Sequence, residues 1–203
     1  MARLVYSAIC SLDGFTADAA GDFGFAFPDP EVMAFVNGQT AAVGTFLHGR
    51  RMYELMRGWE TDPSWAEGTS GEADFAAHWQ RVDKVVFSAT LDPAEVVTRR
   101  TRLERVFDPV AVRALVAGAD QDVTVDGPTL AASAFRAGIV DEVHLLLAPA
   151  VVGAGLRALP DDVPTALRLL DTRRFEGGFV HVRYAVQGGP PRWSPTGEAG
   201  PTG

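Results

Sequence analysis

The sequence predicts an α/β protein with an open, mixed β-sheet and helices on both faces of the sheet. Strand-like and helix-like segments alternate over the first two-thirds of the chain, as they do when helices connect parallel strands. The last patterned segments are strand-like only, which indicates a closing antiparallel pair. The chain has 203 residues, of which 47% are hydrophobic, so it is long enough for one well-packed core and short for two.

The first strand is expected over residues 4–10, an apolar run with Val and Ile that ends before the turn-forming pair Asp13-Gly14. Residues 18–30 are rich in Gly, Asp, Pro and Phe, so we expect a loop there. A helix begins at Pro30, because proline is favoured at the first helical position. The apolar side of this helix comprises Val32, Met33, Phe35 and Val36.

The middle of the chain predicts two further strands, each with a helix beside it. Residues 42–47 form a strand that Gly49 ends, and residues 50–57 form the next helix. The segments after it follow in this order: a loop over residues 58–72, a helix over residues 75–81 and a third strand over residues 84–88.

The last third is expected to contain two helices and four strands. Asp108 precedes Pro109, which is the arrangement of a helix N-cap followed by proline. The apolar positions of this helix are Val110, Val112, Leu115 and Val116. Gly127-Pro128 begins another helix, which Gly138 ends. The strands cover residues 122–125, 142–148, 165–170 and 179–186, and the run 142–148 is apolar enough for burial on both faces.

Residues 1–187 are predicted to form one domain, and residues 188–203 a flexible tail. Nine of the sixteen tail residues are Gly or Pro, so the segment cannot bury enough surface to offset the entropy of ordering it. Its one bulky apolar residue, Trp193, is expected to be exposed to solvent.

Composition and charge exclude several classes of protein. The formal net charge is −8 and the pI is near 4.9, with no basic stripe, so nucleic-acid binding is not expected. No apolar run approaches the roughly 18 residues of a membrane span, and the N-terminus lacks the order of a signal peptide. The four histidines are scattered and Cys10 is the one cysteine, so neither a metal site nor an internal disulfide is expected. We therefore expect a cytoplasmic protein in which Cys10 is a small buried apolar residue.

Two turns between a strand and a helix are candidate anion sites. In the first, Gly49 ends a strand, and Arg50 and Arg51 enter a helix whose first N–H groups are unpaired and attract a phosphate. The alternative is a pair of solvated arginines on an exposed turn. The second turn is Asp126-Gly127-Pro128-Thr129, and Ser88-Ala89-Thr90 adds hydroxyls that can bind a ribose. In an open α/β sheet all these residues lie beyond the carboxyl ends of strands, where ligands bind.

A third glycine-rich segment is interpreted as a turn or a close approach of two chain segments. Residues 153–158, GAGLRA, match the Gly-x-Gly-x-x-Ala motif of dinucleotide-binding proteins. That motif functions where a helix begins directly after the glycines and a parallel strand follows. Pro160 and Pro164 would cut such a helix short, and only strand-like segments follow. We therefore do not expect a Rossmann-type site here.

Six short motifs stand in order along residues 3–186. They are SLDG (11–14), GRRMYE (49–54), DKVVFSATL (83–91), VDGPTL (125–130), AGIVDEV (137–143) and APAVVGAG (148–155). Together they resemble the dihydrofolate-reductase-like superfamily, in the branch of the riboflavin-biosynthesis reductase domain. That domain is the C-terminal part of a bifunctional deaminase–reductase, and it has many stand-alone homologues. The resemblance implies a three-layer fold with a mixed, mostly parallel sheet and an antiparallel C-terminal strand pair.

The same resemblance implies an NADPH-dependent reductase that acts on a small-molecule substrate and forms a homodimer. The turn of Gly49, Arg50, Arg51 and Met52 would hold cofactor phosphate, and Ser88, Ala89 and Thr90 would hold the adenosine ribose or its 2′-phosphate. The residues implied near the pyrophosphate and nicotinamide are Asp126, Gly127, Pro128, Thr129 and Leu130, together with Ala8, Ile9 and Thr16. Asp13 is the candidate catalytic carboxylate, in contact with substrate or relaying a proton, and its alternative role is that of a plain turn residue before Gly14.

Two departures from the family pattern bear on the substrate and the cofactor. Asp126 stands where the family usually has Gly, and a carboxylate beside a pyrophosphate is repelled by about 1 kcal/mol or more. The alternatives are that Asp126 bonds a ribose hydroxyl or caps the helix at Pro128. Asp29 and Glu31 lie only at the start of the first helix, so folate reduction is not indicated.

Three functions are therefore open from the sequence. The first is hydride transfer from NADPH to a C=N or C=O carbon of a small planar polar heterocycle, such as a pterin or a pyrimidine. The second is non-catalytic binding of a nucleotide or another ligand on the same fold. The third is a flavin- or deazaflavin-dependent reductase.

Overall fold

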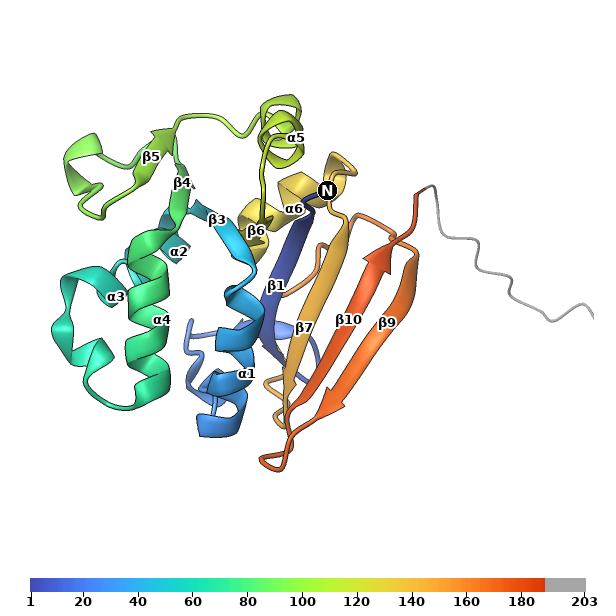
Figure 1. The fold of residues 1–203 in the computed structure, drawn as a ribbon. Coiled ribbons are helices and arrows are strands. Elements are labelled where there is room, and N and C mark those ends of the chain that lie inside the picture. The colour runs from blue at the N-terminus through green and yellow to red at the C-terminus, as the bar shows by residue number, and fades with distance from the viewer. Residues whose placement is uncertain (189–203) are drawn as a thin grey trace, which may run out of the picture.

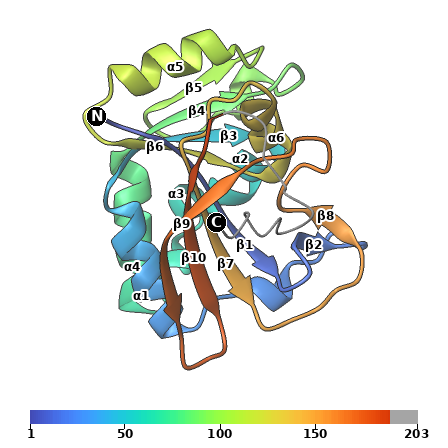
Figure 2. The same cartoon turned by 90° about the vertical axis from the view of Figure 1, so that its right-hand side faces the viewer.

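The computed structural model describes residues 1–188, so residues 189–203, with most of the predicted tail and Trp193, lie outside the described residues. The strands are β1 (Leu4–Ser11), β2 (Phe15–Asp18), β3 (Val43–Gly49), β4 (Asp83–Phe87), β5 (Thr101–Glu104), β6 (Asp122–Asp126), β7 (Glu142–Ala148), β8 (Gly155–Arg157), β9 (Leu167–Arg174) and β10 (Val180–Val186). The α-helices are α1 (Pro30–Thr40), α2 (Arg50–Met56), α3 (Gly58–Thr61), α4 (Ser70–Arg81), α5 (Pro109–Ala117) and α6 (Pro128–Arg136), and the 3-10 helices are η1 (Gly24–Ala26), η2 (Pro63–Ala66) and η3 (Pro93–Glu95). In the part of the chain that the structure describes, eight strands form one sheet (Figure 1), and β2 pairs with β8 beside it (Figure 2).

The large sheet is mixed, as the sequence predicts. Its strand order is β5-β4-β3-β6-β1-β7-β10-β9. The strands from β5 to β7 run parallel, β10 is antiparallel to β7, and β9 is antiparallel to β10. The antiparallel pair therefore closes the sheet on one side, and the carboxyl ends of β4, β3, β6 and β1 lie along one edge.

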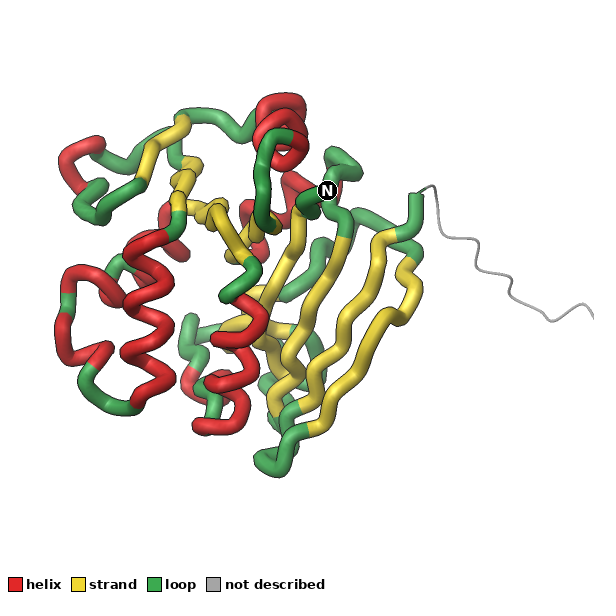
Figure 3. The backbone as a smooth tube through the Cα atoms, in the orientation of Figure 1, coloured by secondary structure: helices red, strands yellow, loops and turns green. Residues whose placement is uncertain are grey.

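Helices cover both faces of this sheet, so the described residues form three layers (Figure 3). On one face, Leu130 of α6 packs in a cluster with Tyr6 of β1, and α5 joins the same cluster. On the other face, Val32 of α1 packs with Leu146 of β7, and Trp79 of α4 packs against β3. Figure 2 shows α1 and α4 together on that side of the sheet. Burial from both sides explains why the parallel strands are near-continuous apolar runs.

The helices α1 and α5 begin where the sequence predicts them, and each has an aspartate N-cap, of which the sequence predicts only that of Asp108. Asp29 accepts a hydrogen bond from the first turn of α1 at 2.9 Å, and Asp108 does the same for α5 at 2.9 Å. Val110 is wrong as an apolar position of α5, because its side chain is 76% exposed whereas Val112 and Val116 are buried. Val112 and Val116 are four residues apart on the inner side, and Val110 points about 200° away from Val112 around the helix axis.

The predicted loop over residues 58–72 is wrong, because short helices occupy most of it. It contains α3 and η2, and α4 begins at Ser70, before the predicted start at residue 75. Thr69 supplies the N-cap of α4 with its hydroxyl. Trp65 packs against Trp59 with ring centroids 5.2 Å apart. These contacts order a polar segment that has no apolar periodicity of its own.

The sequence patterns predict none of β2, β5 and β8. The strand β5 lies at the sheet edge with exposed charged side chains, so it lacks an apolar run. The strands β2 and β8 depend on each other, since Phe15 pairs with Arg157 far along the chain. At Gly155 an added Cβ would lie 1.9 Å from the carbonyl oxygen of Ala17, which confirms the interpretation of this glycine as a close chain approach.

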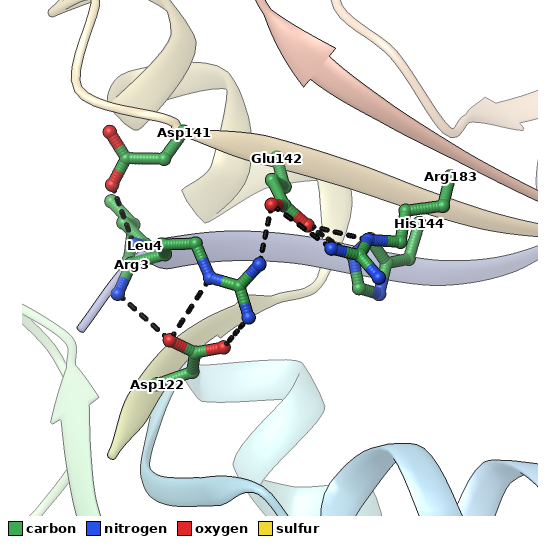
Figure 4. Close-up of polar contacts among 7 residues, drawn as sticks. All are labelled: Arg3, Leu4, Asp122, Asp141, Glu142, His144 and Arg183. Atoms are coloured by element: carbon green, nitrogen blue, oxygen red, sulfur yellow. Dashed lines mark hydrogen bonds and ion pairs between the residues drawn. The ribbon is translucent and has the colours of Figure 1, made fainter. Parts of the chain in front are cut away.

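A polar network lies at the amino ends of β1, β6 and β7 (Figure 4). Arg3 bonds to Asp122 and Glu142, which ties β1 to β6 and β7. Glu142 also accepts a hydrogen bond from Nε of Arg183 on β10 at 2.8 Å and lies 3.0 Å from Nε2 of His144. Burial alone raises the pKa of Glu142, but its hydrogen bonds to these three basic side chains outweigh burial and lower the pKa to about 2. The network therefore links β1, β6, β7 and β10 at the end of the sheet where the parallel strands begin.

Within residues 1–188, no helix combines the length and the apolar character that crossing a bilayer requires. In the same range, no three His, Cys, Asp or Glu side chains gather where they could hold a metal ion. Cys10 is fully buried in β1, and this burial, with the nearby charge of Asp13 second, raises the pKa of its thiol to about 11. The thiol is therefore protonated at neutral pH and serves as a small apolar side chain, as expected.

Candidate functional site

The carboxyl ends of β4 and β3 bring two of the predicted cofactor segments into contact. Arg50, the first residue of α2, donates from Nη1 to the hydroxyl of Thr90 beyond β4 at 3.2 Å. Its Nε bonds to Glu54 one helical turn later at 2.7 Å. Arg51 is exposed at the same turn. The guanidinium of Arg50 is thus paired with the carboxylate of Glu54, whereas the side chain of Arg51 faces solvent.

The turn after β6 packs against the turn after β3. An added Cβ at Gly127 would lie 3.4 Å from Cβ of Met52, and one at Gly49 would lie 3.7 Å from Cβ of Leu130. The backbone of Gly127 has φ +87°, a conformation that side-chain-bearing residues rarely adopt. Thr129 is exposed in the first turn of α6. The three predicted segments therefore form one continuous surface at the edge of the sheet.

The helices that begin at this edge have no side-chain cap. Both α2, which starts after Gly49, and α6, which starts after Gly127, lack a side-chain hydrogen bond at the N-cap, whereas α1, α4 and α5 each have one. Pro128 has no N–H, so it removes one unpaired donor of α6, and no N-cap side chain accepts a hydrogen bond from the first turn of either helix. The alternative that Asp126 caps α6 is wrong, because its carboxylate bonds to the Thr124 hydroxyl instead.

The turn after β4 is shaped by a serine and an arginine. The Ser88 hydroxyl accepts hydrogen bonds from the N–H groups of Thr90 at 3.2 Å and Leu91 at 3.0 Å, so this hydroxyl holds the turn in shape. Ala89 and Thr90 are exposed beside it. Arg105 donates from Nη1 to the carbonyl oxygens of Ser88 and Leu91. The sequence does not indicate that Arg105 lies at the turn after β4. The charged segment around β5 lacks the apolar pattern that would predict a strand beside β4.

The predicted nicotinamide segment begins in β1. Ala8 packs on the α5–α6 side of the sheet and Ile9 on the α1 side, so the two side chains face opposite layers. The Thr16 hydroxyl donates to the carbonyl oxygen of Leu156 on β8 at 3.1 Å. In β1, the side chains of Ala8 and Ile9 are both half-buried.

Asp13 lies in the turn after β1 and holds a second turn with its carboxylate. It accepts hydrogen bonds from the N–H groups of Val152 at 3.2 Å and Gly153 at 2.7 Å. The hydroxyl of Ser11, and then these N–H groups, lower the pKa of Asp13 below its ordinary value. The carboxylate is therefore ionised at neutral pH and connects the β1–β2 turn to the segment after β7.

Asp126 has a different environment at the end of β6. Its Oδ2 accepts a hydrogen bond from the Thr124 hydroxyl at 3.0 Å and lies 3.6 Å from Nδ1 of His48 on β3. The Asp126 side chain is 16% exposed, and His48 is fully buried. Burial raises the pKa of Asp126 to about 7, against a smaller opposing contribution from Thr124. Nothing in the sequence pattern indicated His48 as a neighbour of this carboxylate.

Comparison with known proteins gives one family and a set of structural relatives. The model of the RibD C-terminal domain family matches residues 2–181. The uncharacterized protein YyaP of Bacillus subtilis (strain 168) is 27% identical over 194 residues, which are 92% of this chain and 96% of that protein.

Solved structures share the fold at low sequence identity. A putative riboflavin biosynthesis protein from Shewanella sp. PV-4 superposes with a TM-score of 0.71 at 16% identity, covering 91% of this chain and 99% of that one. A pyrimidine reductase-like protein from Corynebacterium diphtheriae gives a TM-score of 0.64 at 17% identity, covering 92% of each chain.

Proposed function

The chain belongs to the RibD C-terminal domain family, and on this premise we propose that it is an NADPH-dependent reductase. The membership confirms the family that the six sequence motifs predict, and the mixed sheet with helices on both faces confirms the predicted fold. The proposed reaction is hydride transfer to a C=N or C=O carbon of a small planar polar heterocycle, of which a pyrimidine is one example.

The observation that carries this proposal is the meeting of three cofactor-type segments at one edge of the sheet. The turn after β3 contacts the turn after β4 through Arg50 and Thr90, and it packs against the turn after β6 through Met52 and Gly127. Two uncapped helices begin within this surface, and unpaired N–H groups at helix starts attract phosphate. Glycines let the backbone approach a ligand closely, and arginine adds charge-assisted hydrogen bonds.

Each segment then has a distinct task in binding the dinucleotide. NADPH would supply the hydride, and the protein supplies position and electrostatics. Arg50, Arg51 and the N–H groups of α2 would bind phosphate. Thr90 and Ala89 would face the adenosine ribose, with Arg105 adding positive charge at the same turn. Gly127, with the residues that follow it, would lie along the pyrophosphate, and Ile9 beside the nicotinamide. Asp13 remains the predicted contact to substrate.

We expect NADPH to bind more tightly than NADH, by about tenfold or more, because a charge-assisted contact to the 2′-phosphate contributes about 1.5–3 kcal/mol. Binding is measured by fluorescence titration of the protein with each nucleotide. A thermal-shift panel with NADPH, NADH and flavin mononucleotide runs beside it, since a ligand at 100 times its Kd stabilises by about 2.7 kcal/mol. Equal affinity for both nucleotides, or binding of the flavin alone, would contradict the assignment of NADPH.

We also propose a homodimer that buries apolar strand surface near residues 142–152. Leu145 and Leu147 of β7 are only half-buried, and Val151 after that strand is 70% exposed. On the edge strand β9, Leu169 is 51% exposed, and Figure 2 shows β9 and β10 with no helix in front of them. Apolar side chains gathered on an open sheet face favour association with a second copy.

Light scattering at micromolar concentration is expected to give about twice the 21.7 kDa of one chain. Val151→Lys should shift the mass toward one chain, because it would bury an unpaired charge in the interface. Val110→Lys is the matched control, since Val110 is 76% exposed on α5, away from this surface. A parent mass near 21.7 kDa, or equal effects of both variants, would show that the apolar surface around residues 142–152 is not the interface.

A further inference from the structure

A row of polar side chains crosses the middle of the sheet. In register, Asp126 on β6 pairs with Ser7 on β1, and Ser7 pairs with His144 on β7. Side chains that pair in register lie on the same face of a sheet. This face is the one that α1 covers, because Leu146, two residues after His144, packs in a cluster with that helix.

Solvent reaches this row at Ser7. This residue lies in the middle of β1, which has a strand on each side, and is nevertheless exposed. The cluster under α1 lies on β7 and β10, and the cluster under α4 lies on β3, so the row opens between two helix-covered patches. The small side chain of Ser7 separates Asp126 from His144, whose strands are two spacings apart, roughly 10 Å. A flat ligand above Ser7 would therefore lie beside both neighbours.

Glu142 fixes one nitrogen of the His144 ring (Figure 4). Its Oε2 lies 3.0 Å from Nε2 of His144 and accepts a hydrogen bond from Nε of Arg183 at 2.8 Å, while Arg3 donates to Oε1. Burial raises the pKa of Glu142, but these hydrogen bonds outweigh it, and the pKa is about 2. A carboxylate only accepts hydrogen bonds, so the hydrogen shared with His144 is carried by Nε2.

The other nitrogen of His144 is therefore an acceptor. Burial, ahead of the positive charges of Arg183 and Arg3, lowers the pKa of His144 against the opposing effect of Glu142, so the ring is neutral at pH 7. A neutral imidazole that carries its hydrogen on Nε2 has a lone pair on Nδ1. Within residues 1–188, no donor bonds to this Nδ1, and the atom is not fully buried.

A second histidine holds the ring of His144 in place. The ring of His181 on β10 lies at 88° to that of His144, with centroids 5.7 Å apart, and it also packs against Phe35 of α1 at 4.7 Å. Burial first, and then His144, lower the pKa of His181 to about 4, so His181 is neutral and brings no charge beside His144. The acceptor Nδ1 thus has a defined position at the edge of the accessible row.

We propose that His144 determines substrate specificity, with Nδ1 accepting a hydrogen bond from a ring N–H of a substrate that lies above Ser7. The inference rests on the proposed function and narrows its substrate class to a planar heterocycle that carries a ring N–H, such as a cyclic amide, rather than a simple ketone or aldehyde. Glu142 is the positioning residue, because it keeps the hydrogen of His144 on Nε2.

The position of the row agrees with this role. Ile9, which would lie beside the nicotinamide, is two residues after Ser7 on the same face, roughly 7 Å along the strand. A ring above Ser7 would therefore be a neighbour of the hydride donor. A ligand without the N–H would leave Nδ1 unpaired, and an unpaired polar group in a binding site is the basis of strong discrimination.

The first test combines protein variants with ligand variants. The probe is lumazine, a flat pteridine-dione with C=N bonds and two ring N–H groups, beside the two lumazines in which a methyl group replaces one of these hydrogens. Fluorescence titration of the parent with NADP+ present should show about tenfold or more weaker binding of one methylated probe, because Nδ1 then has no donor.

Three variants assign that preference to the acceptor. His144→Leu should bind lumazine and the weaker methylated probe equally, because it has no acceptor at this position. His144→Asn should keep the preference, since its amide oxygen can accept near the position of Nδ1. His181→Leu is the matched control, because it removes the neighbouring imidazole, and it should also keep the preference. A preference that persists in His144→Leu, or that His181→Leu removes as well, would overturn the proposal.

The second test needs no ligand and no variant of His144. The 15N chemical shifts of the histidine side chains in the parent report which ring nitrogen carries hydrogen. We expect hydrogen on Nε2 of His144 and none on Nδ1 at pH 7. Glu142→Gln should give a mixture of both forms, because an amide can donate as well as accept. Hydrogen on Nδ1 in the parent would overturn the proposal even if the variants of His144 do not fold.

The remaining outcomes separate this proposal from the proposed function. If the parent binds NADPH but not lumazine, His144 does not recognise such a ring, and the assignment of the cofactor stands. If the parent does not bind NADPH, the proposed function fails, whereas the same titrations without nucleotide still decide whether His144 recognises the N–H group.

Discussion

Alanine at position 155 is expected to destabilise the protein by about 2–5 kcal/mol, because it combines backbone strain with a steric clash. The added Cβ would lie 1.9 Å from the carbonyl oxygen of Ala17 and 2.7 Å from the carbonyl carbon of Asp18. Both atoms belong to the backbone of β2, so neither can rotate away as the end of a side chain can. Gly155 also has φ +148°, which side-chain-bearing residues rarely adopt. The Gly155→Ala variant must therefore either separate β2 from β8 or keep the steric clash and the strained backbone in its folded state.

Urea unfolding of Gly155→Ala and Gly153→Ala measures this difference. Gly153 is the matched control, because it also has a positive φ, +80°, but an added Cβ there would meet no atom within 4 Å. It should therefore lose only about 1–2 kcal/mol from the backbone conformation. Thr16 bonds to Leu156 of β8, so Gly155→Ala should also weaken NADPH binding. Equal losses of stability in the two variants would contradict the close approach of β2 and β8.

Removing Arg51 is expected to weaken NADPH binding about ten- to a hundredfold, since a charge-assisted contact to phosphate contributes about 1.5–3 kcal/mol. Arg51 is exposed at the start of α2, where its guanidinium can reach a ligand. Arg50 already bonds to Glu54 and Thr90, so Arg50→Ala should weaken binding and also loosen the contact between the turns after β3 and β4. Exposed arginines add little to stability, so the Tm of each variant should stay near that of the parent.

Fluorescence titration with NADPH and a melting curve are recorded for Arg50→Ala, Arg51→Ala and Arg81→Ala. Arg81 is the control for the loss of one exposed arginine, because it ends α4 before the amino end of β4, away from the carboxyl ends. Parent-like binding by both Arg50→Ala and Arg51→Ala would place the phosphate site elsewhere. A loss of several degrees in Tm without ligand would show that these arginines are structural.

The local signals in the sequence determined most of the elements that flank the site. Apolar runs marked β1, β3, β4, β6 and β7, since a parallel strand covered on both faces needs such side chains. Asp108-Pro109 and Gly127-Pro128 marked the starts of α5 and α6, because caps and N1 prolines act over a few residues. The order of the short motifs also predicted the family. These features depend on residues that are close together in the sequence, so a sequence pattern can predict them.

The tertiary structure alone decided which distant residues meet. The strands β2 and β8 form because the segments around Ala17 and Gly155 come together, and neither segment has a strand pattern without the other. Arg105 reaches the turn after β4 only because β5 pairs at the edge of the sheet. His48, Asp126 and Ser7 share a row because β3, β6 and β1 are adjacent and in register. Burial in that row raises the pKa of Asp126 to about 7. Burial depends on how the strands pack together, which the sequence of a single strand does not predict.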